Sequence, residues 1–414
     1  MRNKKLKNRW LMVVSAVSMH LSIGSVYAYS VMVKPVSEIF NVNGSVINWA
    51  FKLAILLLGF SAAFMGRWVE KVGPKKSGIV AGIFYGVGII GSGLAIYLHS
   101  LPLFLFCYGV IGGIGLGIAY ITPVSTLVKW FPDKRGLATG MAIMGFGFSA
   151  LIFGPLMQIL FEKVGVTYTF FILGVVYLAM ILLAASYIER PPENYLPHGF
   201  NPGEGVTLKK DLSNIDAKAA LKTARFYYIW IMMFINITCG IALIAAASPM
   251  TQEKLGYTPL QAAALVGVIG VFNGLGRIMW SSLSDYLGRS NTFILFFSFQ
   301  ILAYYFLPQI TIEIVFLVIL FTVITMYGGG FATLPAFLGD LFGTKQLGAI
   351  HGMVLTSWAL AGVAGPSIYD YVKETTGSLT ITLQVFSAMF IIAWIISLLM
   401  KRSINKLKRS LNNA

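Results

Sequence analysis

Long apolar runs alternate with short polar stretches along almost the whole chain. Twelve of these runs reach about 20 residues, the length that crosses a bilayer as a helix. In lipid only helices and closed barrels satisfy the backbone, and these runs are too long and too evenly apolar for barrel strands. The runs cover 10–33, 47–67, 78–98, 102–128, 137–161, 167–188, 227–250, 260–284, 292–310, 314–338, 349–371 and 379–400. The pattern therefore predicts an all-α membrane protein with twelve transmembrane helices.

The composition agrees with this pattern and excludes several other classes. Of the 414 residues, 57% are hydrophobic and 11% are charged, whereas soluble proteins average about 25% charged residues. Cys107 and Cys239 both lie in apolar runs, so they imply neither a disulfide framework nor a metal site. The sequence contains no phosphate loop of the form G-x-x-x-x-G-K-S/T and no nucleophile–base cluster. We therefore expect a protein that is not an enzyme, binds no cofactor or metal, and is driven by gradients rather than ATP.

The positive charges predict the orientation. With the N-terminus placed inside, most of the 31 Lys and Arg residues fall in the terminal tails and in loops on that side. The opposite loops hold only Lys34, Lys163, Lys254 and Lys373. Positive charge marks the cytoplasmic side of membrane proteins, so we expect both termini in the cytoplasm of a multi-pass inner (plasma) membrane protein. The net charge of +16 is scattered over many short loops, which favours a topology signal over a nucleic-acid surface.

The longest polar stretch divides the chain. Residues 189–225 are rich in Pro, Gly and charge, which predicts a cytoplasmic linker. The linker is either a solvated tether or a tether with a short amphipathic helix near Ile215–Ala224. On this division, residues 1–188 form an N-terminal six-helix bundle, and residues 226–414 form a C-terminal six-helix bundle with a short basic tail.

The two halves also resemble each other at a nearly constant offset. The matched pairs are Pro123 with Pro335, Gly140 with Gly352, and Gly154-Pro155 with Gly365-Pro366. Such a parallel repeat is the plan of transporters that rock two bundles about a binding site at the middle of the membrane. The repeat therefore predicts two pseudo-symmetric six-helix bundles.

Arg277 lies inside the apolar segment Leu260–Leu283. A guanidinium at that depth costs about 3 kcal/mol on insertion scales, and it cannot lose its charge. It must face protein, water or an anion. Asn273, four residues earlier, shares its helix face, and the planar fork of arginine suits a carboxylate. We interpret the pair as substrate-binding; the alternative is a structural arginine that bonds helix-end carbonyls or extends to the cytosol.

Two further polar side chains lie within predicted helices. His20, Gly24 and Tyr27 share one face of the first helix. An unperturbed histidine titrates near neutral pH, so His20 is expected to be either a proton carrier or a satisfied packing residue. Lys52 lies near the outer end of the second helix, where it either extends to the surface or supplies a second cation. All fifteen Asp and Glu residues lie in loops or at helix ends, so no buried carboxylate is expected to carry a proton.

Two loop motifs carry a family resemblance. GRWVEKVGPKK (Gly66–Lys76) resembles the signature G-x-x-x-D-x-x-G-R/K-R/K of the major facilitator superfamily, and SLSDYLGR (Ser282–Arg289) resembles its repeat between helices eight and nine. That family uses the acid and its basic neighbours as a cytoplasmic latch. The resemblance makes Gly66, Glu70, Gly73, Asp285, Gly288 and Arg289 candidate gating residues. The chain departs in having Glu70 for Asp, Ser281 for Gly, and no buried arginine in helix four, unlike the sugar/proton and drug/proton branches.

Within the superfamily the chain looks most like the oxalate/formate antiporter family of bacterial monocarboxylate- or lactate-type carriers. The matching motifs are NRW, KWFPDKRGLATG (Lys129–Gly140), FNGLGR (Phe272–Arg277) and YGGGFATLP (Tyr327–Pro335). The resemblance implies a small carboxylate substrate bound by Arg277. It also suggests Tyr27, Tyr120, Tyr327 and Phe331 as aromatic pocket residues. Trp358 stands where the oxalate carrier has a second basic residue, which argues for a monocarboxylate.

These observations predict a monomeric secondary transporter in the lipid bilayer. The expected substrate is a monocarboxylate such as lactate, pyruvate or formate, moved by alternating access with proton symport or anion exchange. The alternatives are a dicarboxylate exchanger of the oxalate/formate type, for which Lys52 would supply the second cation, and a transporter-like carboxylate sensor. A sensor would need a substantial cytoplasmic domain, and the tail Lys401–Ala414 is short.

Overall fold

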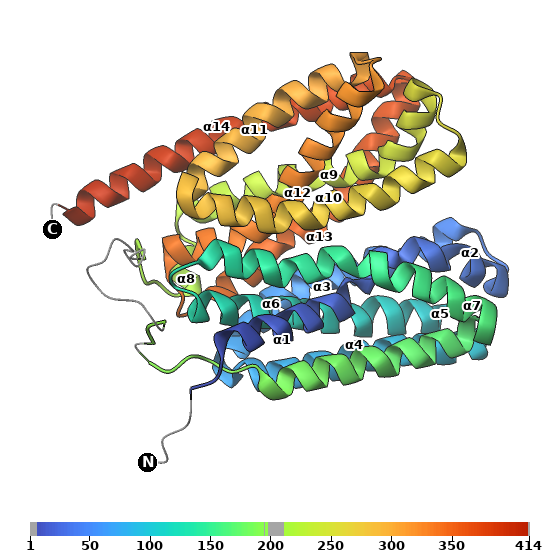
Figure 1. Ribbon diagram of the computed structural model, residues 1–414, viewed down its shortest axis with the longest axis horizontal. Coiled ribbons are helices and arrows are strands. Elements are labelled where there is room, and N and C mark those ends of the chain that lie inside the picture. The colour runs from blue at the N-terminus through green and yellow to red at the C-terminus, as the bar shows by residue number, and fades with distance from the viewer. Residues whose placement is uncertain (1–5, 194, 198–210, 413–414) are drawn as a thin grey trace.

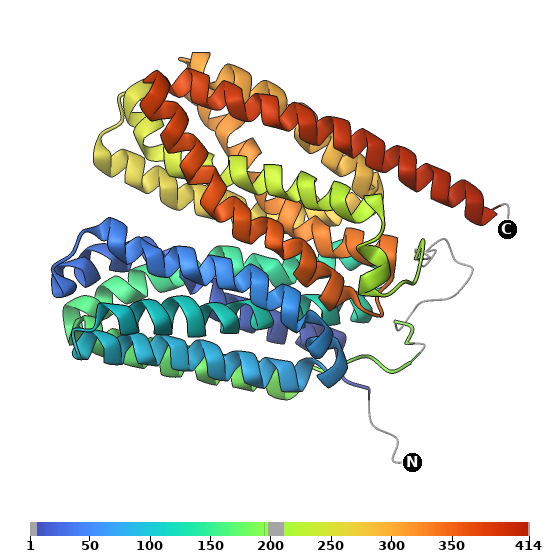
Figure 2. The same cartoon turned by 180° about the vertical axis from the view of Figure 1, so that it is seen from behind.

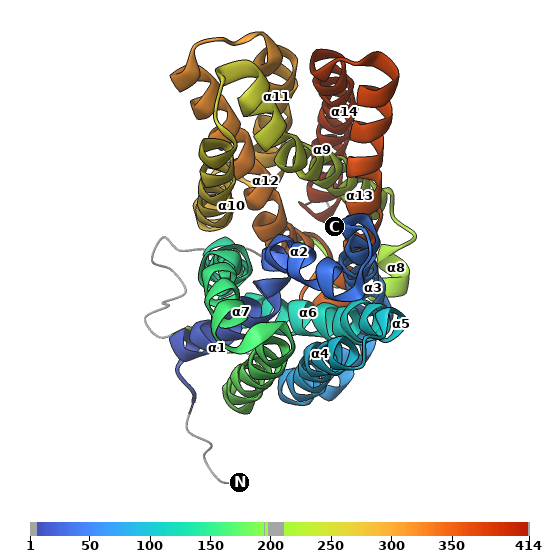
Figure 3. The same cartoon turned by 90° about the vertical axis from the view of Figure 1, so that its right-hand side faces the viewer.

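The computed structural model describes residues 6–193, 195–197 and 211–412, and in these residues the secondary structure is helical with no strand. Figure 1 shows two bundles of long helices side by side, with helices α1 to α7 in one and α9 to α14 in the other. The view along the bundles separates the same two groups (Figure 3). The predicted all-α fold with two helical bundles is therefore confirmed.

The first bundle holds the N-terminal half of the chain. Its elements are α1 (Arg9–Ile23), the 3-10 turn η1 (Gly24–Ala28), α2 (Tyr29–Phe40), α3 (Gly44–Val72), α4 (Pro74–Tyr97), α5 (Leu101–Phe104), the π-helical segment η2 (Leu105–Gly112), α6 (Gly113–Trp130) and α7 (Arg135–Tyr187). The first span is thus interrupted at Gly24–Ala28, which places Tyr27 in a tighter turn than an α-helix.

The second bundle follows a short helix, α8 (Ala217–Ala220). Its elements are α9 (Ala224–Leu255), α10 (Pro259–Leu287), α11 (Arg289–Phe306), the 3-10 turn η3 (Leu307–Gln309), α12 (Glu313–Phe342), α13 (Leu347–Thr376) and α14 (Leu379–Asn412). Among the described residues, 11 continuous helical segments are long and apolar enough to cross a membrane. One of them, α7, contains two of the predicted spans, because Gly165 (φ 81°) breaks it into two helices.

Both described ends of the chain lie on the same side of the molecule. The start of α1 and the end of α14 lie at the same end (Figures 1 and 2). We call this the terminal end, and it also holds the loops at Gly73, 131–134, Gly288 and 343–346. Lys and Arg side chains that the sequence places inside gather here, as the ion pairs described below show.

The bundles touch along two pairs of helices, α3 with α13 and α7 with α10, and small residues line both contacts. A methyl group added at Gly66 of α3 would lie 2.6 Å from Ala349 Cα, and one added at Gly59 would lie 2.6 Å from Ala359 Cβ. Such contacts bring backbones together, as small residues commonly do between membrane helices. The close packing therefore leaves the central polar residues shielded between the bundles.

The start of the linker contacts the first bundle, where Trp130 Nε1 donates to Glu189 O at 2.7 Å, and its residues 212–215 are bonded to the second bundle. Leu212 N donates to Asp340 O at 2.9 Å, Ser213 Oγ to Leu341 O at 2.6 Å, and Ile215 N to Phe342 O at 3.1 Å. These bonds satisfy carbonyls at the C-terminal end of α12, which have no partner within their own helix. The four-residue helix α8 falls inside the segment where a short amphipathic helix was expected, and residues 198–210 of the linker lie outside the described residues.

Candidate functional site

Arg277 lies at the centre of the molecule, between the two bundles. Its side chain is buried, with the residue 1% exposed, so it does not extend to the cytosolic or outer surface. Its Nη1 donates to the backbone carbonyl of Ile143, on α7 of the other bundle, at 2.9 Å. Its Nε lies 3.4 Å from Asn273 Oδ1 on its own helix. Within the described part of the chain, Nη2 has no hydrogen-bond partner, so one arm of the fork remains available.

Aromatic rings from both bundles enclose this guanidinium. Its central carbon lies 5.7 Å from the ring centres of Phe146 (α7) and Phe331 (α12). Phe331 packs on Trp358 at 4.8 Å and on Tyr327 at 5.5 Å, and Phe146 packs on Tyr27 at 4.8 Å. The arginine cluster, as we call it, consists of Arg277, Asn273, Tyr27, Tyr120, Phe146, Tyr327, Phe331 and Trp358. The structure thus brings together every residue that the sequence suggested for the pocket.

Tyr120 of α6 links the two halves of the arginine cluster. Its ring lies 5.7 Å from Phe146 in the first bundle and 5.5 Å from Trp358 in the second. The hydroxyl groups of Tyr27 and Tyr120 are buried, and neither has a hydrogen-bond partner among the described residues. The charge of Arg277 acts on both tyrosines. Buried polar groups are normally paired, so two free hydroxyls beside a guanidinium suit an anionic ligand with oxygen acceptors.

Glycine allows α12 to approach this cluster. A methyl group added at Gly328 would meet both the backbone oxygen and Oδ1 of Asn273. Gly328 and Gly329 therefore serve close packing of α12 on α10, which carries Asn273 and Arg277, and Gly330 serves packing on Asn236 of α9. Phe146 was missed by the sequence analysis; its flanking glycines in GFGFSA were the signal of a closely packed helix face.

The other two candidate residues within the helices lie in different settings. His20 is buried inside the first bundle, with Nδ1 2.9 Å from Ala142 O and Nε2 3.1 Å from Tyr120 O. It thereby joins α1 to both α6 and α7. Lys52 is exposed, and its Nζ lies 4.9 Å from the ring centre of Trp49. The structure therefore does not bring Lys52 to the arginine cluster.

The candidate gating acids lie at the terminal end, and each reaches the opposite bundle. Glu70 of α3 pairs with Lys129 at 2.6 Å and accepts a hydrogen bond from Gly348 N, in the first turn of α13, at 2.8 Å. Asp285 of α10 accepts from Gly136 N at 3.2 Å and Leu137 N at 3.3 Å, in the first turn of α7. A carboxylate is stabilised at a helix N-terminus by the unpaired amides and the helix dipole.

A second set of ion pairs joins the bundles and the linker. Asp340 of α12 pairs with Arg135 of α7 at 3.0 Å and with Arg289 of α11 at 3.0 Å, and Arg289 also pairs with Asp285 at 2.5 Å. Asp211 of the linker pairs with Arg135 at 2.6 Å. Burial raises the pKa of the Asp211 carboxyl, although the charge of Arg135 opposes this shift. No role was predicted for Arg135, Asp211 or Asp340 from the sequence, although Arg135 lies in the motif KWFPDKRGLATG.

Gly66, Gly73 and Gly288 of the candidate motif occupy structural positions. Gly73 (φ 85°) and Gly288 (φ 84°) end α3 and α10 in the left-handed region that favours glycine. Gly66 lies in the close contact with α13. Gly73 and Gly288 therefore shape the two turns that follow the candidate gating acids, and Gly66 serves helix packing.

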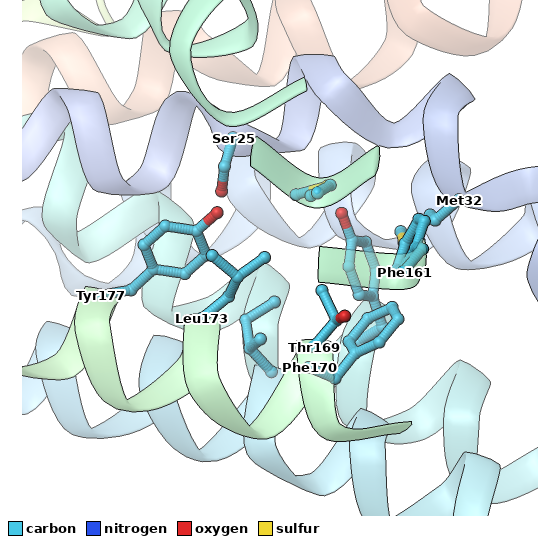
Figure 4. A pocket seen from close by; sticks show the side chains of 10 residues that line it. Ser25, Met32, Phe161, Thr169, Phe170, Leu173 and Tyr177 are labelled. Carbon is cyan, nitrogen blue, oxygen red and sulfur yellow. The ribbon is translucent and has the colours of Figure 1, made fainter. Parts of the chain in front are cut away.

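Two cavities lie outside the arginine cluster. One, of about 290 Å³, opens at the terminal end beside Lys129, Arg135 and Arg190. The other, of about 20 Å³, lies within the first bundle between Ser25 and Tyr177 (Figure 4) and has room for about one water molecule. Neither cavity contains Arg277, so neither is the candidate substrate site.

Comparisons with known proteins agree with this geometry. The chain is 28% identical over 363 residues to the oxalate:formate antiporter of Oxalobacter formigenes, which covers 87% of this chain and 84% of that protein. It is 23% identical over 370 residues to apicoplast pyruvate carrier 1 of Toxoplasma gondii, covering 75% of this chain and 66% of that one.

Solved structures show the fold alone. The E. coli fucose:proton symporter FucP superposes with a TM-score of 0.70 at 14% identity, over 95% of this chain and 99% of that chain. The chain also matches the sequence profile of the Major Facilitator Superfamily over residues 15–366. Twelve membrane spans in two bundles, a candidate central site between them and a matching profile over most of its length together show that this chain belongs to the Major Facilitator Superfamily of membrane transporters.

Proposed function

We propose that this transporter carries a small monocarboxylate such as lactate, pyruvate or formate, by proton symport or anion exchange. The observation that carries the proposal is the setting of Arg277: a buried guanidinium between the bundles, whose charge acts on the buried hydroxyls of Tyr27 and Tyr120. The similarity to proteins named as an oxalate:formate antiporter and a pyruvate carrier supports a carboxylate substrate.

The charge at the site favours a monoanion. Arg277 is the one cationic side chain that the described structure places in the arginine cluster. A single carboxylate neutralises it, which lowers the cost of enclosing the ligand away from water. A dicarboxylate would leave one negative charge there, because Lys52 is exposed at Trp49 and Trp358 is uncharged.

The contact between Arg277 and Ile143 suggests how binding affects the bundles. Nη1 carries two N–H donors, so it can hold the Ile143 carbonyl with one and a carboxylate oxygen with the other, while Nη2 takes the second oxygen. Because the bond to Ile143 joins α10 to α7, a carboxylate bound by Arg277 would lie directly at the contact between the bundles. We further propose that the terminal end faces the cytoplasm, so that the ion pairs there close the cytoplasmic side of the site.

Transport by the purified protein in liposomes tests the proposal. Uptake of radiolabelled lactate, pyruvate, formate and oxalate is measured with and without a pH gradient, and with each anion preloaded inside. The proposal expects uptake of at least one monocarboxylate in preference to oxalate, and its loss in Arg277→Ala. Uptake of oxalate with formate exchange, at rates above all monocarboxylates alone, would favour the dicarboxylate exchanger instead. Binding without any transport would favour a sensor.

A further inference from the structure

His351 of α13 is a buried polar side chain that the site described above does not use. It is 0% exposed, and neither of its ring nitrogens has a hydrogen-bond partner among the described residues. An imidazole carries a polar nitrogen on each side of the ring, and buried polar atoms of this kind are normally paired. The closed arrangement is therefore unfavourable for His351, and a conformation that hydrates it relieves this cost.

The position of His351 shows which movement would hydrate it. Helix α13 begins at Leu347, so His351 lies four residues, or about 6 Å at 1.5 Å per residue, from the terminal end. Gly348, one turn earlier, is the residue that Glu70 holds across the bundle interface. Trp358 lies two turns further in on the same helix face. His351 thus lies between the ion pairs of the terminal end and the arginine cluster.

The contacts of His351 cross the bundle interface. Its ring lies 5.9 Å from that of Tyr120 on α6, the same ring that contacts Trp358. The other titratable group that acts on it is His20 of α1, whose ring is stacked on that of Tyr120 with 5.0 Å between the ring centres. From α3, Glu70 reaches α13 at Gly348 and is paired with Lys129. Separation of α6 from α13 would therefore expose His351.

His20 and His351 differ in how their nitrogens are satisfied. Both nitrogens of His20 face carbonyls within one bundle, so opening between the bundles leaves its contacts with Ala142 and Tyr120 intact. Those of His351 face no partner, and the helix that carries it belongs to the other bundle. The side chains that reach α13 from α9 and α12 include Trp230 and Phe331, which do not titrate.

We propose that His351 is a proton-binding residue that links the opening of the terminal end to pH. When that end opens, a ring nitrogen lone pair accepts one proton from hydronium in the entering water and forms an N–H bond. When it closes, the proton returns to water and the neutral ring is buried again. Acid on that side therefore shifts the population towards the open state, because the proton binds that state preferentially. The proposal rests on the proposed function for alternating access at this end.

Cysteine labelling tests this without any substrate. Cys107 and Cys239 are replaced by serine, and Ser125→Cys is introduced, because Ser125 is buried beside Gly348. Labelling of the purified protein by a maleimide is divided by that of a matched Lys345→Cys variant, whose site is exposed, to cancel the pH dependence of thiol reactivity. One site with the ordinary histidine pKa of about 6.5 predicts about a tenfold rise in the open-to-closed ratio between pH 7.5 and 5.5.

The rise should disappear in His351→Asn and remain in the control His20→Asn. His351→Gln replaces the asparagine variant if that variant does not fold, as judged by gel filtration. A labelling ratio that is flat with pH when His351 is present, or a rise that survives in both His351 variants, overturns the proposal. Failure of every carboxylate to be transported, with the pH-dependent labelling intact, would instead reject the proposed function and leave His351 as a proton-binding residue.

Discussion

Glu70 and Asp285 reach across the bundle interface in opposite directions: Glu70 binds the first turn of α13, and Asp285 binds the first turn of α7. The two contacts are related by the internal repeat, since each acid lies three residues before the glycine that ends its helix, Gly73 or Gly288. Each places a negative charge on the positive end of a helix from the other bundle. Together they hold the terminal end closed from both sides.

Neutralising either acid should therefore favour the open terminal end. Glu70→Gln and Asp285→Asn each remove a charge-assisted contact worth about 1.5–3 kcal/mol, and the partial exposure of both acids reduces this value. We expect labelling of Ser125→Cys to rise and turnover to fall more than substrate affinity does. Asp285→Asn that transports at the normal rate would remove Asp285 from the gating role, and Glu38→Gln serves as a control at an acid outside this end.

Replacements of Arg277 should distinguish the effect of its charge on substrate binding from the effect of its forked shape. Arg277→Lys keeps the charge and loses the fork, so affinity should fall by about one to two decades, the loss of one charge-assisted hydrogen bond. Arg277→Ala should insert and fold but not transport. The measurement is the rise in melting temperature on adding lactate, pyruvate or formate. Equal stabilisation of wild type and Arg277→Ala would show that Arg277 is structural.

The two carboxylates that pair with Arg135 should differ in their effects. Because burial raises the pKa of Asp211, its neutral form is favoured when the linker is attached, so attachment is strengthened as pH falls and weakened as pH rises. Asp211→Asn should leave the linker attached, whereas Asp340→Asn should loosen both the linker and the bundles.

Hydrogen exchange of the Leu212 and Ile215 amides reports this attachment, because both donate to α12 carbonyls. After correction for intrinsic exchange rates, protection should persist in Asp211→Asn and fall in Asp340→Asn. Greater loss of protection in Asp211→Asn than in Asp340→Asn would contradict this ranking.

His20 should contribute mainly to the stability of the first bundle. Its two nitrogens face carbonyls of Ala142 and Tyr120. A neutral imidazole carries one N–H, so His20→Leu removes one hydrogen bond, worth about 0.5–1.5 kcal/mol. We expect a lower melting temperature with the pH dependence of uptake retained. Loss of pH-gradient-driven uptake at unchanged stability would instead support the proton-carrying role that the sequence suggested for His20.

The sequence predicts the spans well because their lengths and apolar character are local properties. Nine of the twelve predicted runs lie wholly within helical segments of the structure, and the runs 78–98, 167–188 and 292–310 each end one residue beyond theirs. The details that were missed depend on neighbours: α14 continues to Asn412, beyond the predicted end at residue 400, and the first span is interrupted by a 3-10 turn at Gly24–Ala28.

The candidate site was predictable where a single charged residue lies within an apolar run. Arg277 is an unavoidable charge in an apolar run, and the pocket aromatics followed from the family resemblance. His351 was not predicted, because a lone histidine in an apolar helix gives no sign of whether its nitrogens are paired. Asp211 was missed because its role depends on a linker that binds α12, a contact between distant parts of the chain.

The backbone-to-backbone seam between α3 and α13 has a mechanical consequence. Helices that pack through interdigitated side chains must separate before they can tilt against each other. Gly59, Gly66 and Gly352 have no side chains at the contact, so α3 and α13 can tilt with little change in packed volume. The contact between α3 and α13 can thus act as a pivot about which one bundle tilts against the other. A single methyl group at Gly59, Gly66 or Gly352 would overlap with backbone atoms of the opposite bundle, so the two helices would have to move apart before they could tilt.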